Sequence, residues 1–134
     1  IIGKDLLVAY TDDLSNINIH KLYKKFLHHK KQKVLITTFK KNSQYGHLVV
    51  NKNGRVRQFI EKPIIQNPIN IGHYIFTLNI LKKYKKLNFE LENNMIPFLS
   101  KKNLLYTYEH KGYFFSINDK KELLYAEKKL KNIK

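Results

Sequence analysis

The order of apolar runs and helical periodicity constrains the fold of this chain more than any other feature. Leu6–Tyr10 is a short, continuous apolar run, which is typical of a buried strand. Asn18 is a residue type that caps helices, and apolar residues then recur at helical spacing from Ile19 to His29. Val34–Phe39 is rich in β-branched residues and predicts a second strand. Strand, helix and strand form a βαβ unit, so we expect an α/β domain with a mixed sheet.

A hairpin is the second strong signal. His47–Val50 and Arg55–Ile60 are β-like segments that flank Asn51–Gly54, and an Asn-Gly pair is a frequent turn between paired strands. No internal repeat or low-complexity linker is present, so we expect residues 1–134 to form one domain. Further strands are expected at His73–Phe76, Leu104–Glu109 and Tyr113–Ile117, and helices at Leu78–Tyr84, Leu91–Leu99 and Lys120–Lys131.

The charge of the chain suggests an anionic partner. Lys and Arg number 26 against 10 Asp and Glu, which gives a net charge of +16. A charge of this size raises nucleic acid as a partner. However, Arg55 and Arg57 are the sequence's two arginines, and specific nucleic-acid sites depend on guanidinium groups. The lysines are also spread along the chain, so we expect solvated charge; an RNA-associated module stays open as an alternative that charge alone favours.

Composition also limits the cellular compartments in which such a chain is expected. Hydrophobic residues make up 43% of the sequence, enough for a packed core. The absence of cysteine excludes disulfides and Cys-based zinc sites and fits a reducing compartment. No apolar run approaches the ~20 residues that a membrane-crossing helix needs. We therefore expect a cytoplasmic protein that does not cross a membrane.

Two carboxylates follow the first predicted strand. Ligands of open α/β sheets gather at the carboxyl ends of strands, and Asp12 and Asp13 stand at such an end. Carboxylates in this place suit Mg²⁺, which takes oxygen ligands and shares them with phosphates. The alternative is that Asp-Asp only marks a turn and the start of a helix.

Other candidates stand at the ends of the later strands. Lys62 precedes Pro63, which should hold it in an extended conformation and direct its ammonium group toward a phosphate. Glu61 beside it would accept hydrogen bonds, although both residues equally suit an ordinary exposed pair. Gly72 either permits close approach of a ligand to the backbone or marks a β-bulge, and Gly46 has the same ambiguity.

Taken in order, these segments resemble the sugar-1-phosphate nucleotidyltransferases, which include glucose-1-phosphate cytidylyltransferases and mannose- or heptose-1-phosphate guanylyltransferases. The resemblance covers nearly the whole chain and depends on the order of seven features, none of which is specific alone. These features are Leu7–Asp12, Tyr45-Gly46, Glu61-Lys62-Pro63, Asn70–Phe76, Leu91-Glu92, Pro97 and Gly112-Tyr113-Phe114.

The resemblance implies a reaction, a fold and a set of site residues. A sugar 1-phosphate would attack the α-phosphorus of a nucleoside triphosphate, and pyrophosphate would leave. Asp12 would hold Mg²⁺ and Lys62 would neutralise the sugar phosphate. Four residues would line the sugar pocket: Gly46, Glu61, Asn70 and Gly72. The fold would be a Rossmann-like mixed sheet flanked by helices, of the nucleotidyltransferase or GT-A-like type.

The chain also departs from this family's pattern. The Gly-rich loop that cradles the triphosphate would lie before Ile1, so we expect a domain truncated at its N-terminus. Thr11 replaces a glycine, and Ile71 stands where a small residue is usual. A second metal-binding Asp of many members is replaced by Ser116, and Asp119 cannot be assumed to substitute for it. The second interpretation is therefore a non-catalytic member that binds a sugar phosphate or a partner subunit, and a homo-oligomer is one such assembly.

Overall fold

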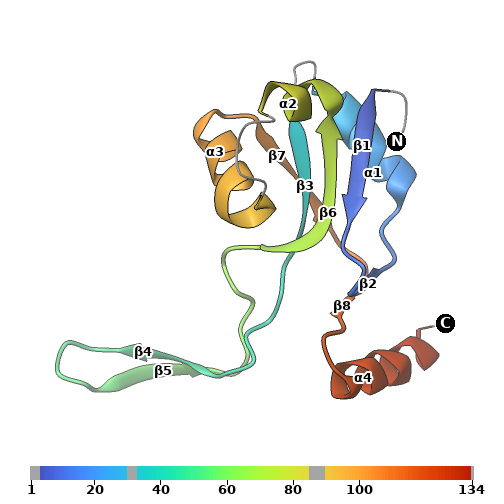
Figure 1. Ribbon diagram of the computed structural model, residues 1–134. Coiled ribbons are helices and arrows are strands. Elements are labelled where there is room, and N and C mark those ends of the chain that lie inside the picture. Colours follow the sequence, from blue (N-terminus) through green and yellow to red (C-terminus); the bar gives the residue numbers. More distant parts are fainter. Residues whose placement is uncertain (1–3, 30–32, 85–89, 134) are drawn as a thin grey trace.

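A computed structural model describes residues 4–29, 33–84 and 90–133 of the chain. Its body is a four-stranded mixed sheet with the strand order β1-β6-β3-β7 (Figure 1). These strands are β1 (Asp5–Ala9), β3 (Val34–Phe39), β6 (Ile69–Thr77) and β7 (Leu105–His110). β3 pairs with β7 in parallel, whereas β6 runs antiparallel to both of its neighbours. The α/β fold class and the mixed sheet predicted from the sequence are confirmed.

The predicted strand-helix-strand unit exists, but its two strands, β1 and β3, are not neighbours in the sheet, because β6 lies between them. β1 and β3 are both antiparallel to β6, so they run parallel to each other on either side of it. The helix between them, α1 (Ile19–Leu27), begins where the sequence predicts. The side chain of its N-cap, Asn18, accepts a 2.9 Å hydrogen bond from the backbone of Lys21. This bond satisfies one of the free N–H groups of the first turn.

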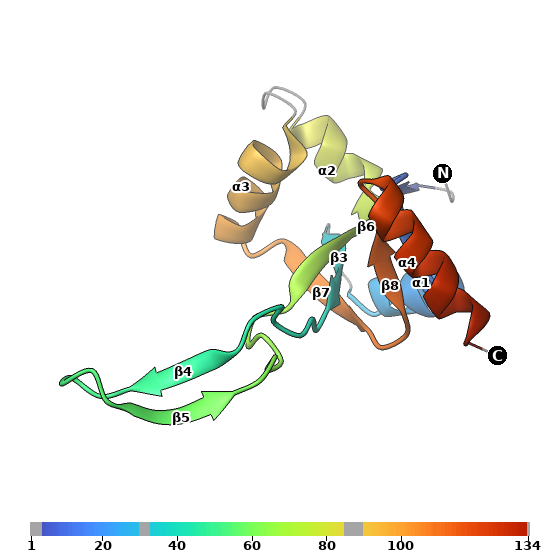
Figure 2. The ribbon, with the colours of Figure 1, turned by 90° about the horizontal axis from the view of Figure 1, so that it is seen from below.

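Helices cover both faces of the sheet. Because side chains alternate along a strand, Leu35 of β3 packs against α1, whereas Val34 and Ile36 face the opposite side. That opposite side is covered by three short helical segments, which Figure 2 shows from below. They are α2 (Leu78–Lys83), a π-helical turn η1 (Leu91–Met95) and α3 (Ile96–Lys101). The single helix predicted at 91–99 is therefore a π turn that continues into an α-helix.

The predicted hairpin forms a separate arm. β4 (His47–Val50) and β5 (Val56–Ile60) pair only with each other within the described part of the chain, and they extend away from the body (Figure 1). Every residue of both strands is exposed. We call residues 45–62 the arm.

A second two-stranded sheet was predicted only in part. β8 (Phe114–Ser116) was expected, but its partner β2 (Asp13–Ser15) was not. α4 (Lys120–Lys131) follows β8, has the predicted bounds, and is capped by Asp119, whose side chain accepts a 2.8 Å hydrogen bond from the backbone of Glu122. In the described residues, no helix is long and apolar enough to cross a membrane.

Candidate functional site

The carboxyl ends of β1, β3 and β7 and the amino end of β6 lie at one edge of the sheet. Asp12 and Asp13 follow β1 at this edge. The carbonyl oxygen of Asp12 accepts a 2.8 Å hydrogen bond from the backbone of Ile117, and Asp13 pairs with Ser116 across β2 and β8. The side chain of Asp12 is exposed, whereas Asp13 is partly buried. The pairing of β2 with β8 thus holds the backbone of Asp12 and Asp13 beside residues that are about a hundred positions away.

Gly72 lies directly against the carboxylate of Asp13. Its φ angle is +68°, and the pairing of β3 with β6 shifts register opposite this point, between Ile36 and Thr38. A Cβ atom on Gly72 would overlap the carboxylate of Asp13 and would lie 2.8 Å from the Cδ2 atom of Tyr10. Gly72 therefore marks an irregularity in the ladder, and the groups that approach it closely are side chains of the protein. Its close approach to a ligand stays a prediction.

Asn70 is connected to the same edge through a buried tyrosine. Its side-chain oxygen accepts a 3.1 Å hydrogen bond from the backbone of Gly72, and its amide group donates to the hydroxyl of Tyr74. That hydroxyl donates a 2.9 Å bond to Glu92 on the η1 turn. Tyr10 completes the group, since its hydroxyl lies 3.4 Å from that of Tyr74. Both ends of the Asn70 side chain are thus engaged within the protein.

Burial and charge change the acidity of two groups in this cluster. The pKa of Asp13 is raised, mainly by burial and further by the carboxylate of Asp12, while a hydrogen bond from Ser116 and the nearby His73 oppose the shift. The pKa of Tyr74 is also raised, mainly by burial, and the bond from Asn70 lowers it in part. A cation beside Asp13 would relieve the cost of its charged form.

The carboxylates can be tested for their fit to Mg²⁺. No cluster of three or more His, Cys, Asp or Glu side chains suited to a metal occurs among residues 4–29, 33–84 and 90–133. Mg²⁺, however, usually keeps several waters and needs one or two carboxylates together with substrate phosphates. Asp12 and Asp13 supply two carboxylates, and neither forms an ion pair with a lysine in the described part. The donor set therefore fits a substrate-assisted Mg²⁺ site and does not fit a closed protein cage.

The other predicted site residues lie on the arm. A Cβ atom on Gly46 would overlap the ring of Phe59 and would lie 3.2 Å from a carboxylate oxygen of Glu61. The ammonium group of Lys62 lies 3.6 Å from the other oxygen of Glu61, and both side chains are exposed. The expectation that Pro63 holds Lys62 extended is wrong, because Lys62 has a φ angle of +44°.

The structure thus gathers the six predicted site residues into two groups. Asp12, Asn70 and Gly72 meet at the sheet edge, and Gly46, Glu61 and Lys62 meet on the arm. Within the described ranges, no hydrogen bond or ion pair connects the side chains of the two groups. Sequence reasoning missed the roles of Tyr74 and Glu92, although both belong to motifs that it quoted.

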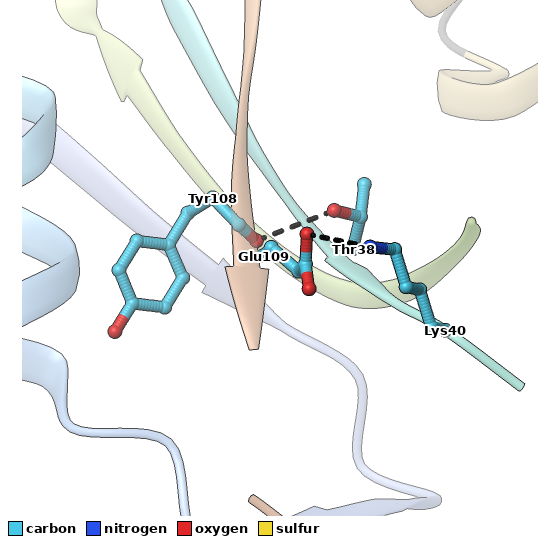
Figure 3. A network of polar contacts seen from close by, with 4 residues as sticks. All are labelled: Thr38, Lys40, Tyr108 and Glu109. Atoms are coloured by element: carbon cyan, nitrogen blue, oxygen red, sulfur yellow. Dashed lines mark hydrogen bonds and ion pairs between the residues drawn. The ribbon is translucent and has the colours of Figure 1, made fainter. Parts of the chain in front are cut away.

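A further polar contact near this edge is structural. The ammonium group of Lys40 lies 3.4 Å from the carboxylate of Glu109, and the hydroxyl of Thr38 donates a 3.5 Å hydrogen bond to the carbonyl of Tyr108. Figure 3 marks both contacts with dashed lines. Both charged groups are about half exposed, so the pair contributes at most about 1 kcal/mol to stability. None of the predicted site residues takes part, so this contact only ties β3 to β7.

The known proteins with a similar sequence are longer than this chain. The mannose-1-phosphate guanylyltransferase catalytic subunit beta of Drosophila melanogaster is 29% identical over 99 residues, which are 72% of this chain and 27% of that protein. The subunit of the same name from Xenopus tropicalis is 26% identical over 121 residues, which are 87% of this chain and 34% of that protein. The chain therefore spans about a quarter to a third of the length of these curated relatives.

Solved structures share the fold. HddC from Yersinia pseudotuberculosis matches 97% of this chain and 57% of its own, with a TM-score of 0.54 and 20% identity. A proposed glucose-1-phosphate thymidylyltransferase from Bacillus anthracis, solved with sucrose, matches 95% of this chain and 55% of its own, with a TM-score of 0.62 and 17% identity. The profile of one family, described as nucleotidyl transferase, matches residues 2–128. The chain therefore belongs to the nucleotidyl transferase family, as the order of its sequence motifs predicted.

Proposed function

We propose that this protein takes part in transferring a nucleotidyl group from a nucleoside triphosphate to a sugar 1-phosphate. The family match supports nucleotidyl transfer, and the relatives named as mannose-1-phosphate guanylyltransferases support a sugar 1-phosphate as acceptor. The observation that carries the proposal is the sheet edge, where the carboxylate of Asp13 lies against Gly72 and Asp12 precedes it with an exposed side chain. A cytoplasmic location stays a prediction.

The proposed reaction forms one bond and breaks another. An oxygen of the sugar phosphate attacks the α-phosphorus of the triphosphate, and the bond from this phosphorus to the bridging oxygen breaks to release pyrophosphate. Such chemistry depends on positioning and on neutralising charge. Mg²⁺ bound at Asp12 would neutralise phosphate charge, and Lys62 would do so for the sugar phosphate. Gly46, Glu61, Asn70 and Gly72 would line the sugar pocket, with Asn70 acting through the backbone that it holds.

A non-catalytic role is the second candidate. Ser116 pairs with Asp13 where a carboxylate would strengthen the Mg²⁺ site, and this absence favours a member that only binds a sugar phosphate or a partner subunit. Ile71 gives no such support, because its side chain is fully buried. An RNA-associated module is favoured by net charge alone, and binding that weakens steeply with salt would support it.

The test is pyrophosphate release with Mg²⁺, each of four nucleoside triphosphates, and a panel of hexose and heptose 1-phosphates. We expect release with one pair of substrates. Lys62→Ala should lower the rate roughly 100-fold, as for loss of one group that stabilises developing charge. Lys52→Ala, a lysine in the turn of the arm, is the matched control and should leave the rate unchanged. No release from the folded protein would favour the non-catalytic candidate.

A further inference from the structure

Three hydrogen bonds in series join the backbone of the sheet edge to a carboxylate on the η1 turn. The backbone N–H of Gly72 donates to the side-chain oxygen of Asn70 at 3.1 Å. The amide group of Asn70 donates to the hydroxyl of Tyr74, and this hydroxyl donates to Oε1 of Glu92 at 2.9 Å. Every bond in the series therefore donates in the same direction, from Gly72 toward Glu92.

The two ends of the series determine this direction. The backbone N–H of Gly72 can only donate, and a carboxylate such as that of Glu92 only accepts. Burial raises the pKa of Tyr74, so its hydroxyl keeps its single proton at neutral pH. Because that proton goes to Glu92, the Tyr74 oxygen can only accept from Asn70. The carboxylate thus sets which way the Asn70 amide faces.

Loss of this carboxylate would remove the constraint on Asn70. The Tyr74 hydroxyl could then donate to the Asn70 oxygen, once the amide group had turned over. The NH₂ group of Asn70 would face the N–H of Gly72, and two donors cannot bond to each other. Gly72, with its φ angle of +68°, would lose the bond that holds its backbone in one of the several conformations open to a glycine.

The surroundings of Tyr74 hold the series in place. Tyr74 is fully buried, and it lies in the same core cluster as Met95 of η1, which is 1% exposed. This packing keeps the η1 turn against the sheet. The hydroxyl of Tyr10, 3.4 Å away, is placed to donate to the remaining acceptor position of the Tyr74 oxygen. Glu92 itself is exposed, so it can be replaced without opening the core.

We propose that Glu92 is a positioning residue, which acts through Tyr74 to fix the Asn70 amide and the Gly72 backbone for binding of the sugar phosphate. The inference rests on the proposed function, which gives Asn70 and Gly72 to the sugar pocket. It makes the η1 turn a part of that site that need not touch the ligand.

The experiment measures binding of mannose 1-phosphate and glucose 1-phosphate by isothermal titration calorimetry, and hydrogen exchange of the Gly72 amide by NMR. Glu92→Met fills the same space without an acceptor, so it should weaken the favoured sugar phosphate about tenfold and speed the exchange. Glu92→Gln keeps an acceptor oxygen and should restore most of the binding. Glu90→Met is the matched control, because this exposed carboxylate bonds to Asn93 and should affect neither measurement.

A double variant tests whether Glu92 acts through Tyr74. Tyr74→Phe removes the hydroxyl and should weaken binding about as much as Glu92→Met does, with circular dichroism to check that the protein stays folded. Adding Glu92→Met to Tyr74→Phe should then cost nothing further, because the series is already broken. Losses that add in full would show that Glu92 acts by another route, and they would overturn the inference.

The remaining outcomes separate the inference from the function. Weaker binding and faster exchange in Glu92→Met, restored in Glu92→Gln, support the positioning role. Unchanged binding and exchange in Glu92→Met overturn it and leave the proposed function standing. Weaker binding without faster exchange at Gly72 also overturns it, since Glu92 would then contact the ligand itself. A protein that binds a sugar phosphate but releases no pyrophosphate contradicts the transfer reaction alone, and failure to bind either sugar phosphate overturns both.

Discussion

Gly72 is the residue whose conformation most directly determines the geometry of the sheet edge. Its φ angle of +68° lies in the left-handed region, and a Cβ atom there would overlap the carboxylate of Asp13. We expect Gly72→Ala to lower the free energy of unfolding by about 2 kcal/mol or more, from backbone strain and steric overlap together. Urea denaturation of the two proteins measures this difference.

A comparison with Gly54, in the turn of the arm, separates the cost of backbone strain from the cost of steric overlap. It also has a positive φ angle, +81°, but no atom lies within 4 Å of the place that its Cβ would occupy. Gly54→Ala should therefore show the backbone cost alone, about 1 kcal/mol. Equal losses in the two variants would show that the contact with Asp13 costs nothing and would contradict the close packing at Gly72.

Lys33 is a second residue whose environment has a measurable consequence. It is 5% exposed, and its ammonium group lies 4.7 Å from the centre of the Phe26 ring. Burial lowers its pKa, and the carboxylate of Asp5 opposes this only in part. Lys33→Met removes the cost of burying the charge and should raise the free energy of unfolding by about 1 kcal/mol at pH 7. Thermal unfolding measures it, with Lys21→Met on the exposed side of α1 as the control.

The sign of the pH dependence follows from the lowered pKa. Between that value and 10.5, the unfolded chain binds more protons at this lysine than the folded chain does. The unmodified protein therefore gains stability relative to Lys33→Met as the pH rises through this window, and the advantage of the variant disappears above it. An advantage that stays constant up to pH 11 would show that Lys33 is not charged and buried in the folded protein.

At the scale of helices and strands, the sequence predicted those elements that short-range interactions form. α4 has its predicted bounds and the arm its predicted turn, because a capping residue or an Asn-Gly pair specifies each of them within a few residues. β2 escaped prediction because its three residues have no periodic pattern and become a strand only by pairing with β8, about a hundred residues later. β6 begins four residues earlier than predicted because the irregularity at Gly72 interrupts its alternation.

The candidate site was likewise predictable where general rules apply and not where long-range contacts decide the conformation. Asp12, Asn70 and Gly72 meet because neighbouring strands end at one edge, which general rules for α/β sheets anticipate. The conformation of Lys62 was not predictable from Pro63, because long-range pairing sets it: the segment after Lys62 is bound to residues 41–43 by two backbone hydrogen bonds. Tertiary contacts thus override the local preference of a residue before proline.

The N-cap of α1 gives an element-scale prediction. The Asn18 side chain accepts from the backbone of Lys21, so Asn18→Ala leaves a free N–H at the start of a helix that packs on the sheet. We expect a loss of about 1 kcal/mol in the free energy of unfolding, measured by urea denaturation, and rescue by Asn18→Asp. Asn132→Ala at the end of α4, where only the backbone of Asn132 caps the helix, should change little. A loss as large at Asn132 as at Asn18 would contradict the capping role.

At the scale of the whole molecule, the net charge of +16 repels itself in the folded state more than in the expanded unfolded chain. Two ion pairs occur between described residues, and all four partners are substantially exposed, so screening removes little attraction. Raising sodium chloride from 0.01 M to 0.5 M shortens the Debye length from about 30 Å to several ångströms. We therefore expect the melting temperature to rise by several degrees over this range, as scanning calorimetry would measure. A melting temperature that falls with salt would mean that attraction between opposite charges outweighs the repulsion, and the excess of lysines would then need another explanation than solvated charge.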